Sequence, residues 1–200
     1  GPELAQVEVA AGNWIRAAAG WRSAVERQPG LVGPAAFSLQ SAPPAARDRL
    51  LRALASDDST GVARRLAAEL LLGWNEPARA WTMLRTALPS APEERSSMVR
   101  AFADRARAQD GPEPQRVAAE ALEMLAATAE PQEAARLRVA SARAFAAAGD
   151  GASARRVLRA MADDPAAPPG IAGTATATLV ELHVREGNPA EASRLLQRSL

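Results

Sequence analysis

The side chains that most often carry catalysis or bind metals are scarce in this chain. His183 is the only histidine, and there is no cysteine. A nucleophilic triad needs a histidine between a nucleophile and a carboxylate, and a zinc site needs several ligands. We therefore expect His183 to be a packed or half-buried side chain. The sequence predicts no catalytic residue, no cofactor and no metal site.

Other short motifs contain reactive residue types but fit turns better. Asp57–Asp58 and Asp163–Asp164 are paired carboxylates that can attract a cation, yet each pair flanks a turn, where solvated helix-end residues are expected. Gly149–Asp150–Gly151 is not a phosphate-binding loop, because the lysine and hydroxyl residue of that loop are missing and no strand precedes it. Catalysis by this chain would require His183 and a carboxylate to meet in a deep pocket.

The composition favours a helical protein and argues against nucleic-acid binding. Of 200 residues, 48% are hydrophobic but only 4% are aromatic, so Ala, Leu and Val must build the core, which suits helices. The 24 basic residues are all arginine and face 23 acidic residues, for a net charge of +1. This balance lacks the basic excess of a nucleic-acid interface. The absence of lysine is typical of a high-GC bacterial coding bias.

The sequence contains no targeting segment that we can identify. No run of about 18 apolar residues is present, so no membrane span is predicted. Gly1–Pro2 resembles the remnant left when a protease removes an expression tag, and we exclude this pair from the domain. Because the natural N-terminus is not visible, localisation in the cytoplasm or in the periplasm stays open.

The stretch from Ala11 to Pro29 is the unit that the rest of the chain repeats. Gly12–Asn13 predicts a turn, since both residue types tolerate positive φ. The apolar positions of the helix that follows are three and four residues apart and share one face: Trp14, Ala17, Trp21 and Ala24. Trp14 and Trp21 are expected in the core, whereas Trp74 beside a later turn is either exposed or packed at a hairpin end. One such helix cannot bury its own apolar stripe, so stacked copies are expected.

Five further stretches repeat the pattern of an alanine followed four residues later by a large apolar residue. The anchor alanines are Ala17, Ala46, Ala80, Ala118, Ala154 and Ala192, at intervals that range from 29 (17 to 46) to 38 (80 to 118) residues. A turn signal stands before each anchor: Gly12–Asn13, Pro43–Pro44, Asn75–Pro77, Asp110–Pro114, Gly149–Gly151 and Gly187–Pro189. Each turn also follows a helix-like stretch. The sequence therefore predicts six helical hairpins.

With these features the chain resembles the tetratricopeptide repeat (TPR) family, whose repeat is about 34 residues of paired antiparallel helices. The fullest match comprises Gly12, Trp14, Ala17, Trp21, Ala24 and Pro29. The resemblance implies an all-α, right-handed superhelical solenoid of about six TPR-like hairpins in one domain over residues 3–200. The hairpins are expected at about 3–29, 30–56, 60–89, 91–127, 131–163 and 170–200. The second and fourth depart from the family pattern, around Gly33–Pro34 and Gly111–Pro112, and generic helical hairpins stay open there.

What the resemblance implies for function is binding, because the first helices of such hairpins line a concave groove that holds a peptide or partner helix. Matching the register places these residues in the groove: Arg65, Glu69, Leu72, Arg100, Asp104, Arg107, Arg136, Val139, Arg143, Glu181, Val184 and Arg185. Arginine outnumbers acid there by six to three, and guanidinium groups bind carboxylates bidentately. An acidic or C-terminal peptide is the expected ligand. The alternative is a set of solvated charges with local pairs such as Arg65–Glu69 and Arg100–Asp104.

The sequence thus predicts a non-enzymatic protein-interaction scaffold that binds a protein or peptide. The alternative is a helical regulatory or substrate-positioning domain of a larger enzyme or transcription regulator. The last stretch, Leu195 to Leu200, carries apolar residues where a solenoid needs a polar cap. Further repeats or a second copy, as in a homodimer, would cover this end.

Overall fold

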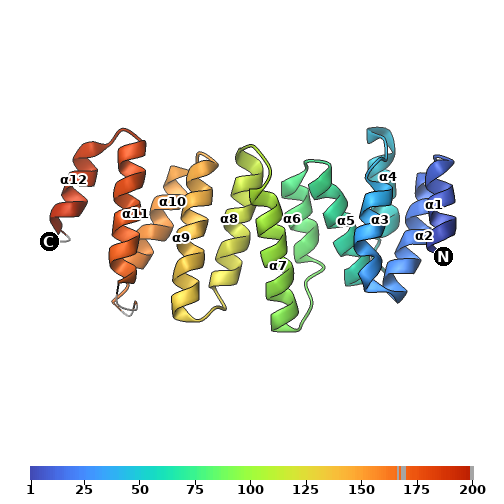
Figure 1. Ribbon diagram of the computed structural model, residues 1–200, viewed down its shortest axis with the longest axis horizontal. Helices are drawn as coiled ribbons and strands as arrows, with labels where there is room; N and C mark the ends of the chain where they lie inside the picture. The colour runs from blue at the N-terminus through green and yellow to red at the C-terminus, as the bar shows by residue number, and fades with distance from the viewer. Residues whose placement is uncertain (166, 168–169, 199–200) are drawn as a thin grey trace. The chain divides into compact units, whose positions relative to one another are not determined.

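The computed structural model describes residues 1–165, 167 and 170–198, and all regular secondary structure in these ranges is helical (Figure 1). The prediction of an all-α fold is confirmed. The chain divides into two compact units, residues 1–92 and residues 93–200, and each is described by itself. The single domain expected over residues 3–200 stays a prediction.

Unit 1 contains six α-helices and one short 3₁₀ helix. They are α1 (Pro2–Ala10), α2 (Trp14–Arg27), η1 (Pro29–Leu31), α3 (Val32–Leu39), α4 (Pro44–Leu54), α5 (Gly61–Gly73) and α6 (Pro77–Arg85). The pairs α1–α2 and α5–α6 pack closely as hairpins, whereas α4 packs mainly against α2 and α3 against α5. The second predicted hairpin is therefore not closed in the same way as its neighbours.

The described part of unit 2 contains six further helices. They are α7 (Pro92–Arg107), α8 (Pro112–Ala126), α9 (Pro131–Ala147), α10 (Gly151–Ala162), α11 (Ile171–Arg185) and α12 (Pro189–Arg198). From α8 onward each helix packs against the next, and side chains of α9, α10 and α11 form a continuous apolar core. Residues 166, 168, 169, 199 and 200 lie outside the described residues, and with them the end of the apolar stretch from Leu195 to Leu200.

Helix starts follow from the fixed φ of proline. Proline is the first helical residue of seven helices in the described chain: Pro2, Pro44, Pro77, Pro92, Pro112, Pro131 and Pro189. In the first turn of a helix the backbone amide has no intrahelical acceptor, so a proline, which lacks this amide hydrogen, removes no helical hydrogen bond there. Apart from Pro2, every described α-helix falls inside the range predicted for its hairpin, whereas η1 crosses the boundary between the first and second ranges.

Four hairpin turns share one backbone geometry. A residue with positive φ follows the first helix: Gly12 (73°), Asn75 (61°), Gly149 (77°) and Gly187 (74°). The next amide donates to the carbonyl five residues earlier, from Asn13 to Glu8 (2.8 Å), Glu76 to Leu71 (2.9 Å), Asp150 to Phe145 (2.9 Å) and Asn188 to His183 (2.7 Å). This is the Schellman motif, which satisfies the last carbonyls of a helix. The second and fourth turns, which depart from the family pattern in sequence, do not follow this geometry.

The repeated alanines are the close-packing positions of the hairpins. All six anchors are buried: Ala17, Ala80, Ala118 and Ala154 at 0% exposed, Ala192 at 4% and Ala46 at 8%. The large residue four positions later is buried in five cases, but Leu196 is 53% exposed.

The tryptophans differ in burial. Trp21 and Trp74 are buried, whereas Trp14 is only half buried. The expectation that Trp14 belongs to the core was therefore wrong, because Trp14 lies in the first turn of α2 and lines a surface pocket together with Ala46 and Arg49 of α4.

Candidate binding groove

Unit 2 contains a groove of about 750 Å³ that runs along α9. Most of its lining comes from α9 itself, from Gln132 to Ala147. Arg107 at the end of α7 and Gln115 at the start of α8 border one part, and Met161 of α10 with the first turn of α11 borders another. The groove therefore depends on four helices packed around the exposed face of α9.

The periodicity of α9 sets which side chains face this groove. Arg136, Val139 and Arg143 are spaced by three and four residues, so they project from one face of the helix. The opposite face carries the buried residues Ala134, Leu137, Ser141, Ala142 and Phe145. Because Arg136 and Arg143 are two turns apart, their Cα atoms are separated by about 10 Å along the helix axis.

The groove is strongly cationic. Arg107, Arg136 and Arg143 are all exposed, and no Asp or Glu is among the described residues that line the groove. Arg136 approaches Glu133 only at 4.0 Å, with 72% of the arginine side chain exposed. Arg107 and Arg143 have no ion-pair partner among the residues that the structure describes. Three guanidinium groups are thus available to an anionic ligand.

Apolar surface lies between the charged groups. Val139 and Ala140 separate the two arginines of α9, and Met161 and Ile171 approach from α10 and α11. The first turn of α11 begins after Gly170 and also lines the groove, so its positive dipole end adds to the field of the arginines. The arrangement combines apolar contact area with donors for carboxylates, which suits a short amphipathic peptide.

The structure brings four of the predicted groove residues together: Arg107, Arg136, Val139 and Arg143. Glu181 and Arg185 of α11 share a small adjoining cavity of about 30 Å³ with Arg143. This cavity continues the surface from α9 toward α11. The sequence did not predict that Gln115, Met161 and the start of α11 line the groove. These residues lie near the ends of their helices, and the repeat pattern identified only residues along the first helix of each hairpin.

The remaining predicted residues of unit 2 have other surroundings. Arg100 pairs with Glu133 at 3.1 Å, which links α7 to α9, and not with Asp104. Asp104 is exposed, and Val184 is 59% exposed without lining either cavity. The local pair expected between Arg100 and Asp104 is therefore not the one that forms.

The predicted residues of unit 1 do not form a groove of this kind. Arg65 and Glu69 are half buried on α5, and Leu72 is 1% exposed. The expectation that Leu72 faces a ligand was wrong. The reason is that α2, α3, α4 and α6 all pack against α5, so that its burial extends well beyond one face.

Neither the single histidine, His183, nor the carboxylate of Asp58 lines the groove. His183 is 4% exposed, as a packed histidine should be, and neither ring nitrogen has a hydrogen-bond partner among the described residues. Asp58 pairs with Arg22 and accepts a hydrogen bond from the Ser56 hydroxyl in the loop before α5. Within the described ranges, no three His, Asp or Glu residues gather in a way that would hold a metal ion.

Comparison with known proteins adds no further constraint. No family model matches this chain, and the comparisons with curated proteins and with solved structures give no match.

No described helix combines the length and the apolar character that crossing a bilayer requires.

Proposed function

We propose that this chain is a non-enzymatic protein-interaction scaffold that binds an acidic peptide segment in the groove along α9. The observation that carries the proposal is the set of three exposed arginines in a groove whose described lining has no carboxylate. Guanidinium groups form bidentate hydrogen bonds with carboxylates. Arg107 and Arg143 have no ion pair in the described chain that a ligand would have to break, and Arg136 has only the 4.0 Å contact with Glu133.

The spacing of the arginines favours a particular peptide geometry. Arg136 and Arg143 are about 10 Å apart along α9. In a polyproline II peptide, every third residue projects from the same side at intervals of about 9 Å. Glutamates at every third position of such a peptide would match the two arginines, with the side chains between them against Val139 and Ala140.

The same proposal treats the hairpins as TPR-like repeats of a right-handed solenoid. Its support is the repeated Schellman turn in four hairpins and the burial of all six anchor alanines. Small-angle scattering tests this arrangement, because a solenoid gives an elongated particle whose maximum dimension grows with the number of repeats. A profile of one closed globule would contradict it.

Binding is tested with a fluorescein-labelled peptide that has glutamate at every third position and proline between, measured by fluorescence anisotropy. The control peptide has glutamine in place of glutamate. We expect saturable binding of the first peptide only, weakened by added salt because the contacts are ionic. Arg136→Gln with Arg143→Gln should weaken binding at least about tenfold, which corresponds to about 1.4 kcal/mol.

Arg159→Gln is the matched control, since Arg159 is an exposed arginine of unit 2 on α10 that does not line the groove. It should leave the affinity unchanged. An equal loss of affinity in the control and in the double variant would mean that the peptide responds to the net charge of the protein and not to the groove arginines. Absence of any saturable binding would favour the alternative in which these arginines are simply solvated.

A further inference from the structure

Unit 1 contains a pocket of about 410 Å³ between the start of α2 and α4. One wall is formed by the segment from Gly12 to Arg16, and the other by Ala46 and Arg49. The volume lies in the range of about 300 to 1,000 Å³ that is usual for small-ligand sites in proteins. Because α2 and α4 pack directly against each other, contact between two neighbouring helices of one unit shapes this pocket.

Trp14 provides the aromatic part of the wall, and its indole group has no partner. The indole nitrogens of Trp21 and Trp74 donate hydrogen bonds, and guanidinium groups lie over the rings of Trp74 and Trp81. Within the described chain, Trp14 neither donates a side-chain hydrogen bond nor has a cation over its ring, although it is half buried. A buried indole N–H group usually finds a hydrogen-bond partner. The ring of Trp14 and its N–H group are therefore open to a ligand.

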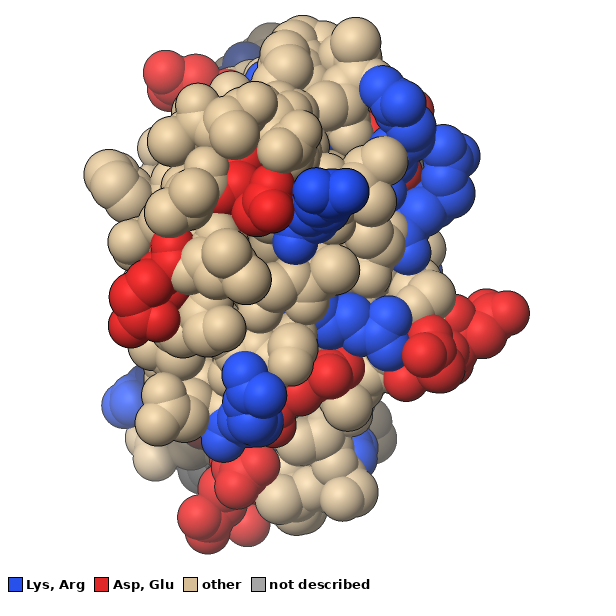
Figure 2. All heavy atoms as spheres, turned by 90° about the vertical axis from the view of Figure 1, so that its right-hand side faces the viewer, with Lys and Arg blue, Asp and Glu red and all other residues tan. Residues whose placement is uncertain are grey.

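Two arginines supply positive charge to the pocket. Arg16 of α2 and Arg49 of α4 are exposed, and neither has an ion pair or a side-chain hydrogen bond in the described chain. The described lining contains no Asp or Glu, and Glu8, which accepts a hydrogen bond from Asn13 at 2.8 Å, is not part of it. Figure 2 views the molecule from the side on which α1 and α2 lie in Figure 1, and shows basic side chains gathered mainly toward one edge of this face. The pocket thus combines two unpaired cations with an aromatic ring.

We propose that this pocket binds an aromatic carboxylate, with the ring of the ligand against Trp14 and its carboxylate held by Arg16 and Arg49. Guanidinium groups hold carboxylates through paired hydrogen bonds, and aromatic rings attract each other in offset-stacked or edge-to-face arrangements. Ile15, which is 49% exposed, adds apolar contact area. A free aromatic acid and the last residue of a peptide that ends in phenylalanine share this chemistry. The inference goes beyond the proposed binding of an acidic peptide and does not use the α9 groove.

NMR titration provides the test, since the indole N–H resonances of the four tryptophans can be followed while N-acetylphenylalanine is added. The resonance of Trp14 is the one that disappears in Trp14→Phe. We expect this resonance to shift in a saturable way, because Trp14 lines the pocket. N-acetylphenylalanine amide lacks the carboxylate and N-acetylalanine lacks the ring, so each should bind at least about tenfold more weakly.

Arg49→Gln should weaken the binding of N-acetylphenylalanine at least about tenfold, and the exposed position of Arg49 makes this variant compatible with folding. Arg27→Gln is the matched control, because Arg27 is an exposed arginine of α2 that has no ion pair in the described chain and does not line the pocket. It should leave the affinity unchanged. The proposal would be overturned by the absence of a saturable shift, by equal binding of either control ligand, or by the same affinity in both variants.

Two further ligands identify the source of the carboxylate. Tighter binding of a tetrapeptide acid that ends in phenylalanine than of 3-phenylpropionate would show that the pocket recognises the C-terminus of a chain. The reverse order would show that it takes a free aromatic acid. Both results support the proposal, because both require the ring and the carboxylate together.

Discussion

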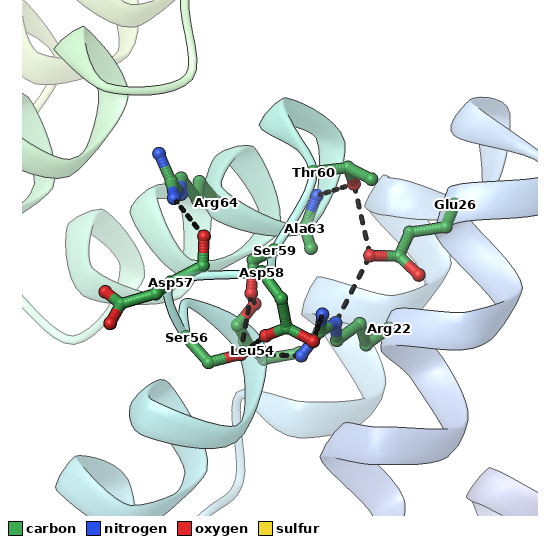
Figure 3. A network of polar contacts seen from close by, with 10 residues as sticks. All are labelled: Arg22, Glu26, Leu54, Ser56, Asp57, Asp58, Ser59, Thr60, Ala63 and Arg64. Carbon is green, nitrogen blue, oxygen red and sulfur yellow. Dashed lines mark hydrogen bonds and ion pairs between the residues drawn. The ribbon is translucent and has the colours of Figure 1, made fainter.

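The guanidinium group of Arg22 on α2 lies 3.1 Å from the carboxylate of Asp58 in the loop between α4 and α5 (Figure 3). It also donates to the hydroxyl of Ser56 at 2.7 Å and to the carboxylate of Glu26 at 3.2 Å. Glu26 in turn accepts a hydrogen bond from Thr60, the N-cap of α5, at 3.2 Å. One arginine therefore holds the start of the central helix of unit 1 against α2.

This network predicts a loss of stability in acid. The hydrogen bond from the Ser56 hydroxyl, followed by that from Arg22, holds the pKa of Asp58 below its ordinary value of 3.8. A lowered folded-state pKa gives stability that is fully present above the unfolded value and is lost as the pH falls through the folded value. We expect the urea midpoint to decrease between about pH 5 and about pH 3, and Asp58→Asn to reduce this dependence.

The neighbouring Asp57→Asn is the control for that experiment. Asp57 is exposed, and its carboxylate has no hydrogen-bond or ion-pair partner in the part of the chain described. The variant should therefore keep the wild-type pH dependence. If Asp58→Asn and Asp57→Asn gave the same slope as the wild type, the contacts with Ser56 and Arg22 would not contribute to stability.

Replacement by alanine should have opposite effects on stability at two glycines of unit 2. Gly149 has φ of 77° in a Schellman turn, so Gly149→Ala should destabilise the protein by about 1 kcal/mol. Gly173 lies in the first turns of α11, and an added Cβ would meet no atom within 4 Å. Gly173→Ala should stabilise it by about 0.5 to 1 kcal/mol through helix propensity. Thermal unfolding compares the two variants, and a shift of both in the same direction would contradict the assigned backbone geometry.

Replacing the buried histidine by an apolar ring should increase stability. His183 is 4% exposed without a hydrogen-bond partner for either ring nitrogen among the described residues, and an unsatisfied buried polar group costs about 1 to 3 kcal/mol. Phe145 occupies the equivalent position before the turn at Gly149. His183→Phe should therefore raise the midpoint of thermal unfolding. A lower midpoint would show that the imidazole makes a favourable contact that phenylalanine cannot replace.

The side chain of Trp74 connects the second and third predicted hairpins. Its Nε1 donates to the carbonyl of Gln40 at 2.8 Å, and the guanidinium of Arg47 lies 4.8 Å from the ring centre. Trp74→Phe leaves this carbonyl without its donor, so we expect a loss of about 1 to 2 kcal/mol in urea unfolding. Trp14→Phe is the control, because Trp14 is half buried and donates no side-chain hydrogen bond within the described chain. Equal losses would point to ring volume, and not to the hydrogen bond, as the cause.

Part of the candidate binding groove could be predicted from the sequence. Arg136, Val139 and Arg143 lie on one helix, so their spacing alone places them on a common face. Arg107 joins them because it ends a helix of the preceding hairpin. The sequence did not reveal the contribution of Met161 or of the first turn of α11, since these groups are brought to the groove by packing between helices.

The sequence by itself determined the helices and their turns, because proline, glycine and asparagine act on the backbone dihedrals of their own segment. The positive φ of Gly12 and Gly187 and the helix starts at proline are effects of this local kind. Only the tertiary structure decided that Leu72 is buried and that Arg100 pairs with Glu133. Burial and ion pairing depend on which other helices surround a side chain, and in α5 and α9 those neighbours come from several segments of the chain.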